Sequence, residues 1–296
     1  MVPTLSIAFM ILSLLLGIGI PVALLLFFRK KYQTSIVSFF IGCGVMLLFA
    51  QVLEQLVHLI VLGSPVGPFI EKNILAIAIY GSLMAGLFEE GGRFIAMRYV
   101  LKKQQGNAHN ALMYGAGHGG YEMIMILAVG MINNLIYSAL INMGQTQAVM
   151  APLDDTMKAT VQTAFDALIQ TPSWHFLLSP IERMAAITAQ IALSVIVWYA
   201  ATGVEAKASL LALAVLLHAL LDGVAVYTAR SGVPLLAVEA IVWVIALGIV
   251  YIARQVWNNN NKKQNADTDL TYKEHTHDSI GNRCSEGNHT RSTLCV

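Results

Sequence analysis

Three short motifs place ionisable side chains inside apolar stretches of this sequence. In the first, Glu89, Glu90 and Arg93 lie within an apolar run from about 74 to 101. Such a run is long enough to span a bilayer, and a charge at that depth costs several kcal/mol unless it faces the interior of a helix bundle. Glu89 and Arg93 are four residues apart, on one helix face where they can pair, and Glu90 points about 100° away. The motif therefore predicts a polar site that other helices complete.

Two further apolar runs each carry an imidazole and a carboxylate at the same helical spacing. Tyr114, His118 and Glu122 form one stripe of a helix, and His218 and Asp222 form the same pairing on another. Glycines flank His118 and allow a neighbouring helix to approach closely. The repeated pairing indicates a shared site rather than separate packing contacts.

Distances along the helices predict one depth for these groups. At a rise of 1.5 Å per residue, Glu89, His118 and His218 lie about 14–18 Å from the expected cytoplasmic helix ends. Glu122 and Asp222 lie about 20 Å from the same ends. Helices that run in opposite directions thus bring all five side chains into nearly one layer, as a single site requires.

The four acids of these motifs outnumber Arg93, so a buried site would hold an excess of negative charge with both histidines neutral. Such an excess is relieved by protonation or by a bound cation. Two carboxylates in different environments can supply a base and an acid, whereas two histidines and a carboxylate form a common catalytic zinc set. The sequence is compatible with both.

The composition indicates a polytopic membrane protein. The 296 residues are 56% hydrophobic and 12% charged, and the mean hydropathy is +0.65. No basic stripe with interleaved aromatic residues predicts a nucleic-acid partner. The number and spacing of the cysteines predict neither a disulfide framework nor a Cys-x-x-Cys metal site.

The positioning elements are therefore expected to be membrane helices. Each apolar run is compatible with one span, and the fourth is long enough to project beyond the bilayer or to contain a break. We expect an all-α polytopic transmembrane bundle of about seven helices, with the N-terminus outside and the C-terminus in the cytoplasm, because Lys and Arg concentrate in alternate loops. The runs are 5–28, 35–62, 74–101, 109–142, 180–202, 208–229 and 233–254.

Two features lie outside the proposed layer in this interpretation. The long connection 143–179 contains a stretch, 156–170, that could form an amphipathic helix on the outer surface. The second feature is a structural polar cluster near the outer face, made of Glu54, His58, Glu182 and Arg183.

The three motifs resemble those of the superfamily of CAAX-processing and bacteriocin-related intramembrane proteases. There, Glu-Glu-x-x-Arg is followed by an aromatic-x-x-x-His motif and by His-x-x-x-Asn or Asp. The Gly-His-Gly-Gly-x-Glu form of the second motif, together with Glu182-Arg183, resembles the YhfC family most closely. The similarity covers the third to sixth helices and, by hydropathy, the membrane part to about Trp257.

The resemblance implies that Glu89 activates a water, while His118 and His218 hold this water or stabilise the oxyanion. Many relatives have Asn where this chain has Asp222, and an acid there favours metal binding or a shared proton. The implied cofactor is Zn²⁺ or another divalent metal, with His118, His218 and Asp222 as possible ligands. The family's catalytic mode is also read as that of a glutamate protease, which needs no metal.

The remaining candidate residues have supporting roles in this reading. Arg93 is expected to orient Glu89, and Tyr114 stands where relatives usually have Phe. Relatives often carry a histidine midway along the fifth helix, where this chain has Gln190. The candidate catalytic residues are Glu89, Glu90, Arg93, His118 and His218, and the supporting ones are Tyr114, Glu122 and Asp222.

We therefore expect an intramembrane endopeptidase that hydrolyses a peptide bond of a membrane-associated protein or peptide, at a site open toward the cytoplasmic half. Residues 1–256 would form the transmembrane helical protease-like domain. The polar residues 257–296 would form a disordered cytoplasmic tail, because they cannot bury enough apolar surface to offset their ordering entropy. The expected location is a bacterial plasma membrane.

Two alternatives use the same residues. Paired histidines and carboxylates inside a membrane also describe a transporter of divalent cations or protons, although the sequence has no convincing internal repeat. The third reading is an inactive membrane scaffold of the same fold.

Overall fold

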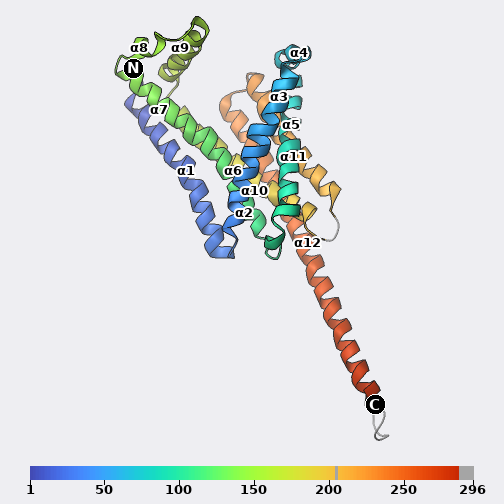
Figure 1. Ribbon diagram of the computed structural model, residues 1–296. Coiled ribbons are helices and arrows are strands. Elements are labelled where there is room, and N and C mark those ends of the chain that lie inside the picture. The colour runs from blue at the N-terminus through green and yellow to red at the C-terminus, as the bar shows by residue number, and fades with distance from the viewer. Residues whose placement is uncertain (204–205, 287–296) are drawn as a thin grey trace. The chain divides into compact units, whose positions relative to one another are not determined.

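The computed structural model describes the backbone of residues 1–203 and 206–286 and the side chains of residues 1–203 and 206–260. This described part is helical and contains no strand (Figure 1). Seven of its helical segments are long and apolar enough to cross a membrane, which confirms the predicted all-α bundle. They are Thr4–Tyr32, Ile36–Leu62, Ile74–Val100, Asn110–Asn142, His175–Ala201, Ala208–Arg230 and Leu235–Asn260.

Several spans are built from more than one helical segment. The charged and histidine side chains of the interior described below lie on η1, α5, α6, α10, α11 and α12. In chain order the elements are α1 (Thr4–Tyr32), α2 (Ile36–Val45), η1 (Met46–Glu54), α3 (Gln55–Leu62), α4 (Gly67–Lys72), α5 (Ile74–Ile95), η2 (Ala96–Val100), η3 (Lys102–Gln104), α6 (Asn110–Met123), η4 (Ile124–Ala128), α7 (Val129–Asn142), α8 (Thr146–Met150), α9 (Asp155–Gln170), α10 (His175–Ala201), α11 (Ala208–Arg230) and α12 (Leu235–Glu286).

The prediction of a disordered tail concerns the end of the chain, which the structure describes only in part. Side chains from 261 onward and all of 287–296 lie outside the described residues. The expected disordered tail, 257–296, therefore stays a prediction, as does its cytoplasmic location.

α10 is the central helix of the bundle. Of its most apolar window, 78% is buried, compared with 22–28% in the other six spans. It packs against α1, α5, α6 and α11. A helix that is apolar on all sides is stable only in such a position, so any polar side chain on α10 must find its partners inside the protein.

Glycines allow α6 to lie close to both α2 and α10. A Cβ atom on Gly117 would lie 1.9 Å from the carbonyl oxygen of Phe39, and one on Gly115 would lie 2.6 Å from Cα of Ile191. Both neighbours are backbone atoms, which cannot move aside as a flexible side chain can. The expected packing role of these glycines is thus present, and it holds α6 tightly against α10.

Three spans contain π-helical segments, and two of these adjoin polar residues of the interior. η1 ends at Glu54, and η4 begins shortly after Glu122. The fourth span is one continuous helical run, Asn110–Asn142, in which η4 is a π-helical segment and not a break. A π-helical turn changes the direction of the side chains that follow, and such turns are frequent at functional sites.

The predicted amphipathic helix at 156–170 is α9. The Asp154 side chain caps its start by accepting a hydrogen bond from the backbone N–H of Met157 at 2.8 Å. Phe165 is buried on the apolar face and contacts the Tyr137 ring of α7 edge to face, with centroids 5.4 Å apart. Within the long connection, α9 is therefore a helix packed against α7.

Candidate active site

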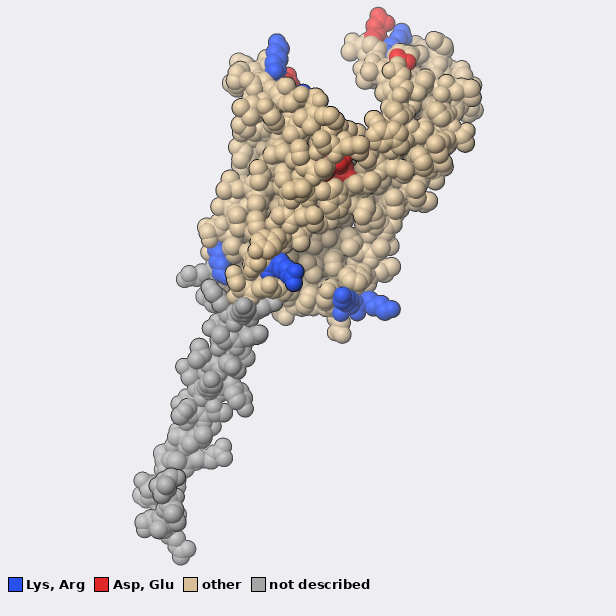
Figure 2. Space-filling model, turned by 180° about the vertical axis from the view of Figure 1, so that it is seen from behind, with Lys and Arg blue, Asp and Glu red and all other residues tan. Residues whose placement is uncertain are grey.

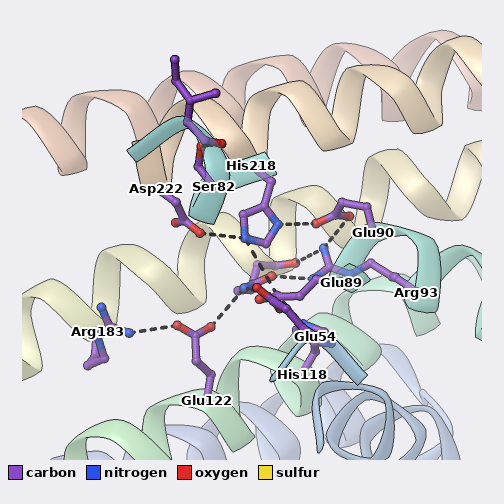
Figure 3. A network of polar contacts seen from close by, with 12 residues as sticks. Glu54, Ser82, Glu89, Glu90, Arg93, His118, Glu122, Arg183, His218 and Asp222 are labelled. Carbon is purple, nitrogen blue, oxygen red and sulfur yellow. Dashed lines mark hydrogen bonds and ion pairs between the residues drawn. The ribbon is translucent and has the colours of Figure 1, made fainter. Parts of the chain in front are cut away.

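The five candidate catalytic residues meet in one polar network inside the bundle (Figure 3). α5, α6 and α11 supply them, as the three motifs predicted, and α10 contributes three further side chains. Glu90, Arg93 and His118 are fully buried, and Glu89 and His218 are 6% and 3% exposed. Side chains as polar as these are stable at this depth only when they bind one another.

Glu89 lies at the centre of the network. Its Oε2 accepts a hydrogen bond from His118 Nε2 at 2.9 Å and another from the Gln190 amide at 3.0 Å. The same oxygen lies 3.9 Å from His218 Nε2. Both imidazoles therefore turn their Nε2 atoms toward one carboxylate oxygen.

Glu90 holds the second histidine. Its Oε1 lies 2.7 Å from His218 Nδ1, and its Oε2 pairs with Arg93 Nη1 at 3.1 Å. The sequence favoured a pair between Arg93 and Glu89, so the partner of Arg93 is corrected to Glu90. A separation of three residues also brings side chains together on a helix, and from there Arg93 can reach α10.

Gln190 joins the two halves of the network. Its Nε2 donates to Glu89 Oε2 and to Glu122 Oε2, each at 3.0 Å. Its Oε1 accepts a hydrogen bond from Arg93 Nη2 at 2.5 Å. Sequence reasoning gave this residue no role, although a lone amide in the apolar core of a membrane helix is itself a signal of a buried polar contact.

Arg183 extends the network beyond Glu122. Its Nη1 donates to Glu122 Oε1 at 2.9 Å, and its Nη2 donates to Glu182 Oε1 at 2.5 Å. The interpretation of Arg183 and Glu182 as part of a separate outer cluster is therefore wrong. Glu122 was expected to support the site, and it does so as the link between Gln190 and Arg183.

Glu54 also belongs to the site. It is buried at the end of η1, and its carboxylate interacts electrostatically with Glu89, His218 and Asp222. Figure 3 places it beside these residues. His58 binds its Oε1 at 3.1 Å. The sequence placed Glu54 away from the layer because residue counting assumes a regular α-helix, whereas η1 is a π-helix.

His218 is enclosed by carboxylates on both sides. Nδ1 faces Glu90, and Nε2 lies 3.3 Å from Asp222 Oδ2 as well as near Glu89. A neutral imidazole that donates Nδ1–H to Glu90 would turn its Nε2 lone pair toward these carboxylates. The arrangement is stable when Nε2 is protonated, or when a cation lies between Nε2 and the carboxylates.

Tyr114 supports His118 from one turn away. The two rings stack with centroids 6.0 Å apart at 24°, and Tyr114 is completely buried. Within the described residues, His118 Nδ1 has no hydrogen-bond partner. Stacking and the bond to Glu89 are thus what orients this imidazole.

The network holds more negative than positive charge. Six carboxylates face the guanidiniums of Arg93 and Arg183, and an excess of negative charge inside the protein favours a bound cation. The carboxylates belong to Glu54, Glu89, Glu90, Glu122, Glu182 and Asp222.

The residue types of the site are ones that bind divalent metals, but in the structure their side chains do not surround a common point. Among the described residues, no group of three or more His, Cys, Asp or Glu is arranged so that it could hold a metal ion as it stands. Zinc nevertheless favours imidazole and carboxylate ligands, and a ligating histidine usually donates its other ring N–H to a carboxylate, as His218 can to Glu90.

A cavity of about 80 Å³ opens beside the network. Glu89, Gln190 and His218 line its inner part, and Glu182 and Asp222 line it farther along α10 and α11. These outer residues lie toward the start of α10, at the end opposite the basic loops. Figure 2 shows acidic side chains at the floor of a hollow and basic ones gathered mainly at the other end. The cavity therefore extends away from the basic end of the bundle. That this end is cytoplasmic, as expected, stays a prediction.

Most of the chain is similar to known proteins. Residues 12–243 match the model of a family described as YhfC intramembrane metalloprotease. An uncharacterized membrane protein of Bacillus subtilis, YhfC, is 37% identical over 248 residues, which covers 83% of this chain and 94% of that protein. No solved structure matches.

Proposed function

The chain belongs to the YhfC intramembrane metalloprotease family, and from this membership we propose that it is an endopeptidase of membrane-embedded or membrane-associated proteins. One observation carries the proposal: His118 Nε2 holds Glu89 Oε2 at 2.9 Å, and Glu89 lines a buried cavity together with His218. A carboxylate that acts as a base toward water must be held in a fixed position and must face a space that can contain the water. The imidazole of His118 and the cavity provide these two conditions.

Glu89 is the general base of this mechanism. The described hydrogen bonds of its carboxylate use Oε2, so Oε1 can take a proton from water in the cavity. The proton then passes to the amine of the leaving group, which regenerates the carboxylate. A positioned acid or base of this kind contributes about 10²–10⁴-fold to a rate.

His118, His218 and Asp222 are the proposed metal ligands, and zinc is the first candidate. A divalent ion held there would polarise the peptide carbonyl and acidify a water. The buried excess of carboxylates supports a cation at this position, and so does the His218 Nε2 atom, which lies 3.3 Å from Asp222 and 3.9 Å from Glu89. In a metal-free mode, the two imidazoles would instead donate to the oxyanion.

Glu90, Arg93 and Gln190 are positioning residues. Glu90 fixes the ring of His218 through Nδ1, and Arg93 fixes both Glu90 and the Gln190 amide. Gln190 in turn fixes Glu89. This chain of contacts keeps the base and one proposed ligand in place without direct contact between Arg93 and the reacting groups.

The test compares new protein N-termini in membranes of cells that carry the wild-type protein or Glu89→Gln. The proposal predicts N-termini inside or next to membrane segments that only the wild type produces. Glu71→Gln is the matched control, because Glu71 is an exposed residue of α4. Identical N-termini in the wild type and Glu89→Gln, with both proteins inserted in equal amounts, would contradict the proposal.

A further inference from the structure

A second cavity adjoins the site on its outer side. Its volume is about 240 Å³, and α7, α10 and α12 supply most of its walls. Glu182 lines both this cavity and the cavity beside Glu89, so the two volumes meet at that residue. We call the second cavity the antechamber.

Glu239 is the most unusual residue of the antechamber. It lies four residues after the start of α12, inside an apolar span, and is only 8% exposed. Within the described residues, its Oε2 is buried and has no hydrogen-bond partner. An intramembrane carboxylate is costly to leave unpaired, so its position on a cavity wall indicates a ligand that is absent from the structure.

No lysine or arginine of the antechamber balances Glu239. Its other acid is Glu182 and its histidine is His175, and no Lys or Arg belongs to its described lining. Arg183 interacts with Glu239 electrostatically, but its guanidinium donates to Glu122 and Glu182. The antechamber is therefore suited to a positively charged ligand.

The walls favour an organic cation over a metal ion. Phe176, Leu178 and Leu235 provide apolar surface, and side-chain oxygen atoms come from Asn134, Thr171, Ser179, Glu182 and Glu239. Among the described residues, no group of three or more His, Cys, Asp or Glu is arranged to hold a metal ion. A lysine or arginine side chain has an apolar stem and a charged end, and such side chains bury their stems on apolar surface. Calcium and magnesium instead require about six or more oxygen ligands.

We propose that the antechamber is a subsite that binds a lysine or arginine side chain of the peptide substrate, with Glu239 as the partner of its charge. That the cation belongs to a peptide rests on the proposed function. The preference for a cation does not, because it follows from the walls alone.

The experiment measures the charge preference directly, without cleavage. Ser179→Cys puts a thiol on the wall, in full-length protein whose three native cysteines are replaced by serine. Its reaction rates with a cationic and an anionic methanethiosulfonate are each divided by the rate with free cysteine. We expect the normalised ratio to favour the cationic reagent by at least about tenfold.

Charge removal at Glu239 tests the assignment. Glu239→Gln should bring the ratio close to one, whereas Glu239→Asp and the control Glu71→Gln should preserve it. Ser231→Cys, an exposed position between α11 and α12, should show no dependence on Glu239. Equal rates at Ser179→Cys for both reagents, or a ratio unchanged by Glu239→Gln, would overturn the proposal.

A protection assay identifies the class of cation. n-Butylammonium, which has the chemistry of a lysine side chain, should slow the reaction of Ser179→Cys with neutral N-ethylmaleimide, and this protection should disappear in Glu239→Gln. Protection by Mg²⁺ or Zn²⁺ without protection by n-butylammonium would overturn the proposal in favour of an ion path.

The substrate part has its own readout. The cleaved sequences should carry Lys or Arg at a constant distance from the cut, and a random distribution would overturn the peptide assignment. Should Glu89→Gln leave cleavage unchanged while the charge preference persists, the proposed function fails and the cation subsite stands.

Discussion

His118 Nε2 of α6 and Glu89 Oε2 of α5 lie 2.9 Å apart. Their hydrogen bond brings the first motif of the sequence into contact with the second. His218 completes the group from a third helix, with Nε2 3.9 Å from the same oxygen. The expected effects of changes at Glu89, Glu122 and His118 depend on this convergence.

Removing the charge of Glu89 should abolish cleavage and leave the protein folded. The amide of Glu89→Gln can still accept a hydrogen bond from His118, but it cannot take a proton from water, so we expect a loss of at least about 10²-fold. Cleavage rate and thermal midpoint in detergent are the two measurements. Near wild-type cleavage by this variant would exclude Glu89 as the base.

Glu122→Gln should reduce activity less than His118→Ala. Glu122 contacts Glu89 only through Gln190. A glutamine there keeps one oxygen that can accept from Arg183 or Gln190 and loses the other contact, while the bond between His118 and Glu89 is untouched. Removal of His118 deletes a direct partner of Glu89. Initial rates of the two variants, compared at equal protein, decide the order, and the reverse order would place Glu122 at the reacting atoms.

A methyl group on Gly117 should destabilise the bundle by about 1–3 kcal/mol, because it would press on the backbone of α2 at Phe39. Gly130→Ala is the matched control, since its Cβ would meet no atom within 4 Å. Thermal midpoints of both variants in the same detergent provide the test. Equal midpoints would mean that α2 and α6 pack less closely in the protein than they do in the structure.

Purified protein should contain about one zinc per chain if the proposed ligand set is correct. His118→Ala and His218→Ala should each lose it, and His109→Ala should keep it, because His109 precedes α6 and stacks on Tyr32 outside the network. Elemental analysis gives the ratio directly. Zinc retained in both site variants would place the metal elsewhere.

Cysteine labelling at Lys103 and Asp154 should report opposite faces of the membrane. Lys103 follows the third span, and Asp154 lies in the connection between the fourth and fifth. With the expected orientation, Lys103 is cytoplasmic. Labelling of both positions from one side would contradict the order of spans, and labelling of Lys103 only from outside would reverse the orientation.

The sequence predicted the site correctly where the residues of a motif lie close together on one regular helix. The spacing of His118 with Glu122, and of His218 with Asp222, holds because α6 and α11 are regular helices at those residues. Residue counting failed for Glu54, because η1 changes the direction of its side chain. The sequence also could not decide which acid pairs with Arg93, because Glu90 and Glu89 lie three and four residues before it. In the structure Arg93 pairs with Glu90 and also contacts Gln190 of α10.

Single polar residues were the least predictable part of the site. Gln190 has no repeated spacing that would mark it, and its role depends on the central position of α10, which follows from the packing of the whole bundle. Glu239 was likewise not singled out. For both, the one available signal is a polar side chain in an apolar span.

Hydrolysis itself can be measured by the isotope that a new carboxyl group acquires. Membrane vesicles with the wild-type protein or Glu89→Gln are incubated in H₂¹⁸O, and peptide C-termini are analysed by mass spectrometry. We predict ¹⁸O-labelled C-termini, within or beside membrane segments, in the wild-type vesicles alone. The same labelled termini in vesicles with Glu89→Gln would contradict an intramembrane peptidase based on Glu89. So would the absence of labelled termini when the wild-type protein is inserted and metal-loaded and its membrane substrates are present.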